Sequence, residues 1–159
     1  MIILGVDPGL TSRNPLGLAL VDTGKGALLD HRAHPLDESV PWQDRLASIM
    51  EFLDGYLSER QAIEAVAYEI PFSGPNRMVG IMLAHVGGLV RALAWLHELP
   101  CAMVHPAQAK IALSGKGNAS KDEQIQAALE RYGVELSKDA ADAVGVALAG
   151  AKVLEGNNE

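Results

Sequence analysis

The sequence predicts an α/β fold, a five-stranded mixed sheet flanked by helices. Short apolar runs bounded by turn residues predict the strands, and apolar residues spaced three or four apart predict the helices. Three strands follow one another closely before the first helix, which is typical of an antiparallel meander. Two further strands alternate with helices, which favours parallel pairing in the same sheet.

The elements follow one another along the whole chain. The expected strands are the five apolar runs at 2–6, 16–21, 27–33, 65–70 and 101–105. The expected helices are the periodic segments at 42–57, 77–97, 121–132 and 138–154. Ser120 and Glu123 have the spacing of a capping box, which predicts that a helix begins at 121.

No repeat or linker divides the 159 residues, so residues 1–154 are expected to form a single domain and residues 155–159 a disordered tail. Cys101 is the single cysteine and cannot form an internal disulfide, and the chain does not begin like a signal peptide. Both features indicate the cytoplasm. Segment 78–96 is long and apolar, but it contains arginine, histidine and three glycines. We therefore expect a buried or dimer-forming helix and no membrane span.

Acidic residues stand where two of the predicted strands end. Asp7 directly follows the first apolar run, and Glu69 lies near the end of the fourth. If these strands are parallel neighbours, both carboxylates lie at one edge of the sheet, where open α/β sheets tend to place their sites. Asp139 and Asp142 are three residues apart on the last helix, share one face, and are candidates to join them.

Some of these acids also have structural explanations. Asp7 precedes Pro-Gly and could form an Asx turn, and Asp139 follows the plausible cap Ser137, where an acid stabilises a helix N-terminus. Asp142 and Glu69 have mostly apolar neighbours, and a buried unpaired carboxylate is costly. Four such acids repel one another unless a cation compensates. Oxygen ligands without a cysteine or histidine cluster favour Mg²⁺ or Mn²⁺, the ions of two-metal phosphodiester cleavage.

Four segments in order resemble the motifs of RuvC-type Holliday-junction resolvases, a family with a ribonuclease H-like fold. The segments are "ILGVDPGL", "YEIPF", "HPAQAKIALSGKGNASKDEQI" and "DAADAVGVALA". The resemblance implies a crossover junction endodeoxyribonuclease that resolves four-way DNA junctions by paired symmetrical nicks, leaving 5′-phosphate and 3′-hydroxyl ends. It also implies a homodimer, with branch-migration proteins as candidate partners.

The resemblance further implies roles for individual residues. The residues implied to bind two metal ions, and so to be catalytic, are Asp7, Glu69, Asp139 and Asp142. The candidates for DNA binding are Phe72, Arg77, Lys110, Lys116 and Lys121. Lys121 is also a catalytic candidate beside the scissile phosphate, and Phe72 would enter the junction centre.

The net charge of −7 argues against a nucleic-acid partner, because phosphate binding depends on lysine and arginine. The segment "KIALSGKGNASK" answers this objection, since it carries three lysines and no acid. It predicts a flexible cationic loop that leads into a helix N-terminus, with a solvated surface loop as the alternative. Bound metal ions would also offset part of the negative charge.

Two segments depart from the family pattern. The segment after Phe72 lacks the usual glycine-glutamine-alanine-arginine-glycine run and has Gly87 where the arginine would be, and the early segment "TSRNPLG" is longer than usual. The alternatives are therefore a broader branched-DNA or structured-RNA nuclease of the same fold, or a non-catalytic branched-DNA-binding protein. A pure binder gains nothing from four acids that face phosphates. ATPases of the actin and sugar-kinase type open similarly but need two lobes, and this chain supplies one.

Overall fold

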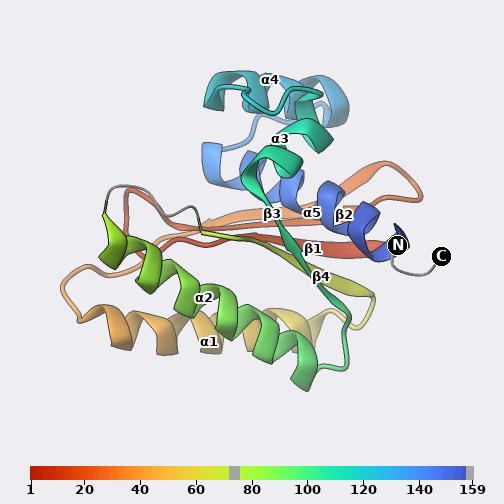
Figure 1. Cartoon of the computed structure of the whole chain (residues 1–159). Helices are drawn as coiled ribbons and strands as arrows, with labels where there is room; N and C mark the ends of the chain where they lie inside the picture. The colour runs from red at the N-terminus through yellow and green to blue at the C-terminus, as the bar shows by residue number, and fades with distance from the viewer. Residues whose placement is uncertain (72–75, 157–159) are drawn as a thin grey trace.

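The computed structural model describes residues 1–71 and 76–156, and its centre is one five-stranded sheet in the order β3-β2-β1-β4-β5 (Figure 1). The strands are β1 (Ile2–Asp7), β2 (Leu16–Asp22), β3 (Ala27–His34), β4 (Ala65–Glu69) and β5 (Cys101–Val104). Strands β1, β2 and β3 pair antiparallel, whereas β4 pairs parallel with β1 and with β5. The predicted meander with two parallel additions is therefore confirmed.

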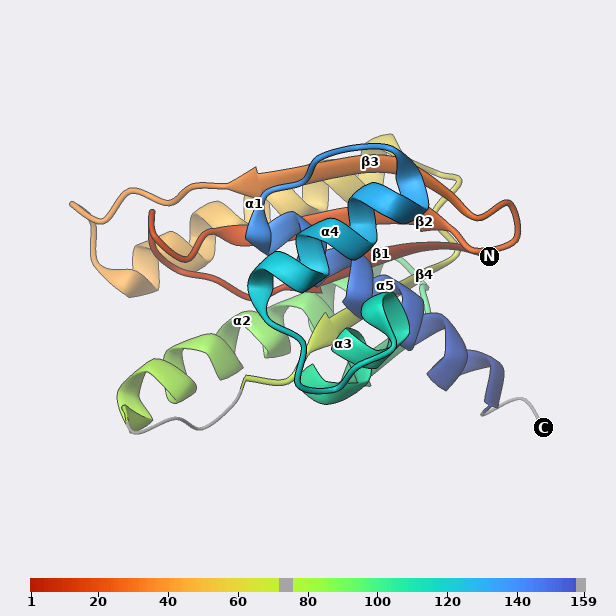
Figure 2. The same ribbon diagram turned by 90° about the horizontal axis from the view of Figure 1, so that it is seen from above.

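Helices cover both faces of the sheet. They are α1 (Trp42–Glu59), α2 (Arg77–Leu96), α3 (Pro106–Ser114), α4 (Lys121–Tyr132) and α5 (Lys138–Gly156). Helices α1 and α2 lie on one face, and α5 and α3 lie on the other with α4 outside them (Figure 1). Figure 2, seen from above, shows α4 and α5 over the strands, with α3 beside α5 and α1 behind the sheet. The four predicted helices are all present.

Helix α3 corrects the prediction that "KIALSGKGNASK" is one flexible loop. Pro106 occupies the first helical turn, where its fixed φ suits a helix start. The His105 backbone N–H donates to the Gln108 side chain at 3.0 Å, and Gly115 ends the helix with φ 78°. Lys110 is thus held on a helix, and only residues 115–120 connect it to α4.

Helix α5 packs very closely against the sheet, and it is buried from Asp139 to Ala151. A Cβ on Gly5 of β1 would lie 2.1 Å from the Ala143 carbonyl oxygen, so only glycine permits this approach. The N-terminal turns of α5 are therefore fixed beside the ends of the central strands. The helix also continues through Gly156, two residues past the predicted end of the domain at 154.

Helix α2 is buried along one side only. Val86, Val90 and Leu93 pack against the sheet, whereas Met78 and Ile81 are exposed. In the described part of the chain, α2 is the one helix long and apolar enough to cross a membrane, with mean hydropathy 1.7 and 28% of the tested window buried. A single helix of this kind is weak evidence for a span, because ordinary core helices meet the same criteria. The expected burial of this segment is therefore only partly met.

Candidate active site

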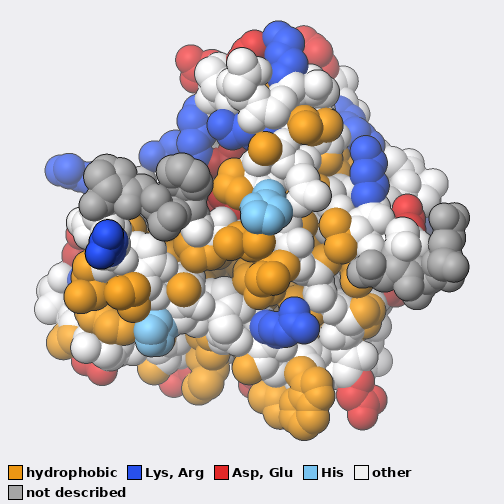
Figure 3. Space-filling view, in the orientation of Figure 1, with side chains coloured by type: hydrophobic (Ala, Val, Ile, Leu, Met, Phe, Trp, Pro, Cys, Tyr) orange, Lys and Arg blue, Asp and Glu red, His pale blue; other side chains and the backbone are white. Residues whose placement is uncertain are grey.

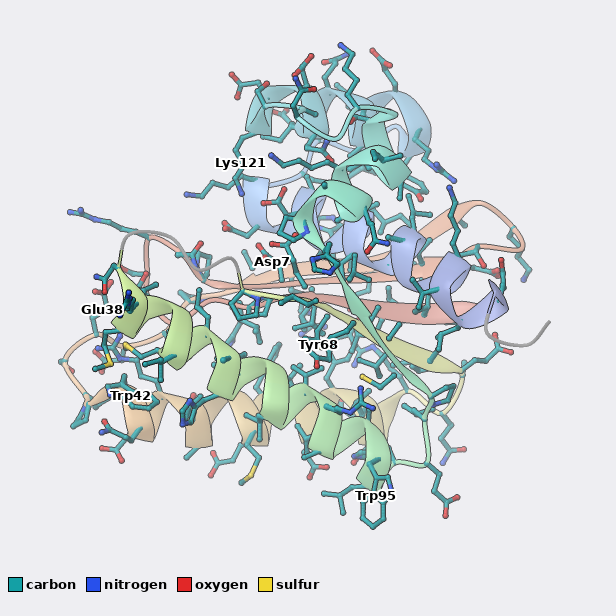
Figure 4. The ribbon with its side chains drawn as sticks, viewed as in Figure 1. Asp7, Glu38, Trp42, Tyr68, Trp95 and Lys121 are labelled. Carbon is teal, nitrogen blue, oxygen red and sulfur yellow. The ribbon has the colours of Figure 1, made fainter. Side chains whose placement is uncertain are left out.

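The strand and helix ends bring the predicted acids to one edge of the sheet. Asp7 is the last residue of β1 and Glu69 the last of β4, and the parallel register pairs Val6 with Tyr68 just before them. Gly17, opposite Asp7 on β2, has no room for a Cβ, which would lie 2.3 Å from the Asp139 carbonyl oxygen. Figure 4 shows Asp7 between the sheet and α5, with Lys121 on the α4 side of it.

Burial and mutual repulsion raise the pKa values of these carboxyl groups. Burial, followed by the charges of Glu69 and Asp142, raises the pKa of Asp7 well above its usual range. Burial and then the Asp142 charge raise the pKa of Glu69 to about 7. Burial also raises the pKa of Asp139. The group therefore favours either protons or added positive charge.

An Asx turn, the structural explanation suggested for Asp7, is formed by a different aspartate. Asp22 ends β2 and is also buried, and its Oδ1 accepts hydrogen bonds from the backbone N–H groups of Gly24 at 3.0 Å and Lys25 at 3.1 Å. Asp22 thus forms an Asx turn. No residue in ranges 1–71 and 76–156 donates a hydrogen bond to the carboxylate of Asp7, which is 9% exposed. The Asx-turn explanation for Asp7 is therefore wrong.

Asp139 retains an unpartnered oxygen. Ser137 caps α5 as predicted, with its Oγ accepting from the Ala140 backbone N–H at 3.2 Å. The Oδ1 atom of Asp139 is buried and has no hydrogen-bond partner among the described residues. Because such an oxygen is costly to leave unpaired, stabilisation of the helix end does not account for Asp139.

Lys121 supplies positive charge to this group of acids. Its ammonium donates to Asp142 Oδ2 from the first residue of α4. Burial lowers the pKa of Lys121, but the hydrogen bond and charge of Asp142 together with Asp7 and Asp139 raise it overall. Within residues 1–71 and 76–156, no three His, Cys, Asp or Glu side chains already stand together as a ready metal-binding group. Asp142 is instead paired with Lys121.

The other predicted DNA-binding residues differ in how close they lie to the acids. The positive charge of Lys110 on α3 lowers the pKa of Glu69, against burial and Asp142, so Lys110 lies near the site. Lys116 pairs with Glu123 at 3.0 Å instead. Arg77 begins α2 and lines an open groove of about 620 Å³ beside Tyr68. Phe72 lies outside the described residues.

The sequence reasoning missed one basic residue near the acids, Lys138, whose charge lowers the pKa of Asp139, and one residue that it holds, Arg13. Lys138 directly precedes Asp139, and its ammonium donates to the Arg13 carbonyl oxygen at 3.1 Å. Arg13 stands in the loop that follows Asp7. In the sequence, the only signal for either residue was its position close to an acidic motif.

The family model described as crossover junction endodeoxyribonuclease RuvC matches residues 3–150. The chain belongs to this family. The RuvC of Frankia casuarinae is 34% identical over 158 residues, covering 93% of this chain and 87% of that protein. The RuvC of an Anaeromyxobacter species is 31% identical, covering 93% and 79%. The predicted enzyme class, a crossover junction endodeoxyribonuclease, is thereby confirmed.

Solved structures show the same fold. The Thermus thermophilus RuvC in complex with a Holliday junction substrate matches with a TM-score of 0.83 and 27% identity, covering 99% of this chain and 96% of that one. A yeast mitochondrial Holliday junction resolvase matches with a TM-score of 0.61 at 13% identity, which supports the fold alone. The predicted ribonuclease H-like fold of the RuvC family is therefore confirmed.

The raised pKa of Glu69 predicts a pH-dependent stability in the metal-free protein. The usual value is 4.5 and the folded value is about 7, so the folded protein binds more protons than the unfolded chain between these values. This carboxyl therefore favours folding at low pH, and that contribution is lost as the pH rises through the window. Glu69→Gln lacks the effect. The melting temperatures of the parent and of Glu69→Gln would be measured in EDTA. The parent value minus the variant value should be larger at about pH 5 than at about pH 8. A constant difference would contradict the assigned pKa.

Proposed function

We propose that this chain is a metal-dependent nuclease that resolves four-way DNA junctions as a homodimer. The observation that carries the proposal is the set of carboxylates at the ends of β1, β4 and α5, buried except for the half-buried Glu69, one of which has an unpartnered oxygen. The Thermus thermophilus relative solved with a Holliday junction substrate supports four-way DNA as the substrate.

The donor set fits divalent cations. All four side chains offer carboxylate oxygens, the ligands that Mg²⁺ and Mn²⁺ prefer, and burial leaves their charge in need of compensation. We assign the metal ligands as Asp7, Glu69, Asp139 and Asp142. Two ions held there would activate water and stabilise negative charge on the leaving oxygen.

The protein itself would contribute in two ways, by holding the carboxylates in place and by supplying positive charge near the phosphate. Asp7 and Glu69 are held by paired strands and Asp139 by a helix that packs directly on the β2 backbone at Gly17, so the carboxylates keep a fixed arrangement. Water attacks the scissile phosphorus and the 3′ oxygen departs, which gives 5′-phosphate and 3′-hydroxyl ends. The charges of Lys121 and Lys110 act on the acids, which supports a role for these ammonium groups in contacting the phosphate and stabilising charge as it develops.

The exposed face of α2 fits a second copy of the chain. Gly80, Ala84 and Gly88 recur every four residues on the groove side of α2, and Ile81 beside them is 50% exposed. Figure 3 shows hydrophobic side chains gathered along this face. Paired symmetrical cuts need two active sites, and identical subunits related by a two-fold axis supply them through one self-complementary surface.

Ile81→Asp is expected to give a monomer, because a charge would be buried at the centre of the proposed interface. Light scattering during gel filtration would measure the mass, and paired cuts in a junction should be replaced by slow single nicks. Met50→Asp is the control, since Met50 is also an exposed apolar residue but lies on α1. An Ile81→Asp protein that remains dimeric would exclude this face as the interface.

The function itself is tested with labelled four-way, three-way and linear DNA and with structured RNA, each incubated in Mg²⁺, Mn²⁺ or EDTA. Symmetrical nicks in the four-way junction that require metal are the expected result. Equal cutting of all branched substrates or preference for RNA would favour a broader nuclease. Binding without cleavage in every metal would favour the non-catalytic binding protein.

A further inference from the structure

The loop between β1 and β2 begins at the active site and is held in a defined shape. We call residues 8–15 the opening loop. Its turn is closed by hydrogen bonds from the Thr11 backbone N–H to the Asn14 carbonyl at 3.1 Å and from the Asn14 N–H to Thr11 Oγ1 at 2.9 Å. A Cβ on Gly9 would lie 2.1 Å from the Pro15 carbonyl oxygen, so the two ends of the loop are in close contact.

Two cationic side chains fasten this loop to the rest of the protein. Arg45 Nη1 on α1 donates to the Leu10 carbonyl at 2.7 Å, and Lys138 Nζ on α5 donates to the Arg13 carbonyl at 3.1 Å. The Ser12 backbone N–H donates to Glu38 Oε1 at 2.9 Å. The backbone at Arg13 is therefore tied to the residue that precedes the acid Asp139.

The Arg13 side chain is exposed, and no ion pair to it is formed within the part of the chain that the structure describes. The facing acid is Glu38. Hydrogen bonds from Ser12, with smaller contributions from Arg45 and Arg13, lower the pKa of Glu38, so this carboxylate already has partners. Figure 3 shows lysine and arginine side chains gathered on the side of the molecule where Figure 4 places Lys121 and Glu38.

The sheet order places this loop across the acids from Lys110. The acids end the central strands β1 and β4; the opening loop leads from β1 to β2, whereas Lys110 lies on α3, which follows β5 beyond β4. The pKa shifts agree with this placement, because the charge of Lys110 lowers the pKa of Glu69 and the charge of Lys138 lowers the pKa of Asp139. A DNA strand whose scissile phosphate lies at the acids would therefore meet positive charge on both sides.

We propose that Arg13, presented by the opening loop and positioned through Lys138, binds a backbone phosphate of the DNA arm that leaves the active site on the β2 side. This inference rests on the proposed function. Arg13 would contact DNA away from the reacting atoms, and Lys138 acts as a positioning residue, since it holds the loop backbone rather than the DNA. The contact carries no base information, because a guanidinium reads the phosphate alone.

Binding of a four-way junction at several salt concentrations tests the proposal, with all proteins carrying Asp7→Asn so that no substrate is cut. Arg13→Ala is expected to weaken binding about three- to tenfold and to reduce the slope of log affinity against log salt by about 1. Arg13→Lys should restore most of the slope. Lys25→Ala is the matched control, since Lys25 is 82% exposed in the turn at the other end of β2 and should change neither quantity.

The possible outcomes separate the role of Arg13 from the proposed function. A parent protein that does not bind the junction would overturn the proposed function. A parent that binds, with Arg13→Ala showing the same affinity and salt slope, would overturn only the role of Arg13. Loss of affinity in Arg13→Ala with an unchanged slope would also overturn the phosphate contact, because it would indicate a change in loop structure.

Discussion

Asp7→Asn is expected to abolish DNA cleavage while leaving junction binding intact or stronger. The substitution removes a negative charge from a site where burial, Glu69 and Asp142 already make that charge costly, so the fold should tolerate it. It also removes a proposed metal ligand. Metal ions supply several kcal/mol of transition-state stabilisation, so the rate should fall by about a thousandfold or more.

Asp22→Asn is the matched control for this experiment. Asp22 and Asp7 both end a central strand and are both buried, but Asp22 accepts backbone hydrogen bonds in a turn, and asparagine can accept them too. Single-turnover cleavage and gel-shift binding would be measured for both variants. Normal cleavage by Asp7→Asn would remove that residue from the site, and equal losses in both variants would indicate a general effect on the fold.

The sequence predicted the sheet because its periodicity and its turns agree. The same pattern could not distinguish Asp7 from Asp22, since each follows an apolar strand. Their roles differ because β1 has β4 as its parallel neighbour and α5 lies across it, and these contacts join residues far apart in the sequence. The alignment of Asp7 with Glu69 was predictable only from the assumption that the two strands are neighbours.

The surroundings of the acids were harder to predict than the acids themselves. Helix α3 is short and rich in alanine, so it shows little amphipathic pattern, and Lys110 was placed in a loop. The Lys138–Arg13 contact spans 125 positions, which no local pattern reveals. Gly87, which departs from the family pattern, lies against Tyr68, where a Cβ would come within 2.8 Å of the ring. The phenol ring therefore occupies the space beside this helix.

Lys121→Ala and Lys116→Ala are expected to separate catalysis from DNA binding. Both lysines form ion pairs, but the partner of Lys121 is Asp142, which is 11% exposed, whereas the partner of Lys116 is Glu123, which is 47% exposed. Lys121 is itself 57% exposed, but its ammonium is held beside the buried acids, and loss of a donor held in place to stabilise transition-state charge costs about a hundredfold or more in rate. Lys121→Ala should therefore slow cleavage strongly with little change in affinity.

Lys116→Ala should mainly weaken binding and reduce its salt dependence, because its ammonium pairs with the exposed Glu123 and not with an acid of the site, so it acts on DNA only as a phosphate contact. Cleavage rates at saturating enzyme and binding at several salt concentrations would be measured for both variants. Metal titration gives a second readout: Lys121→Ala should bind Mg²⁺ more tightly than the parent, because the ammonium no longer competes for Asp142 or repels the ion. Equal effects of the two substitutions on binding alone, with unchanged metal affinity, would show that Lys121 is only another phosphate contact.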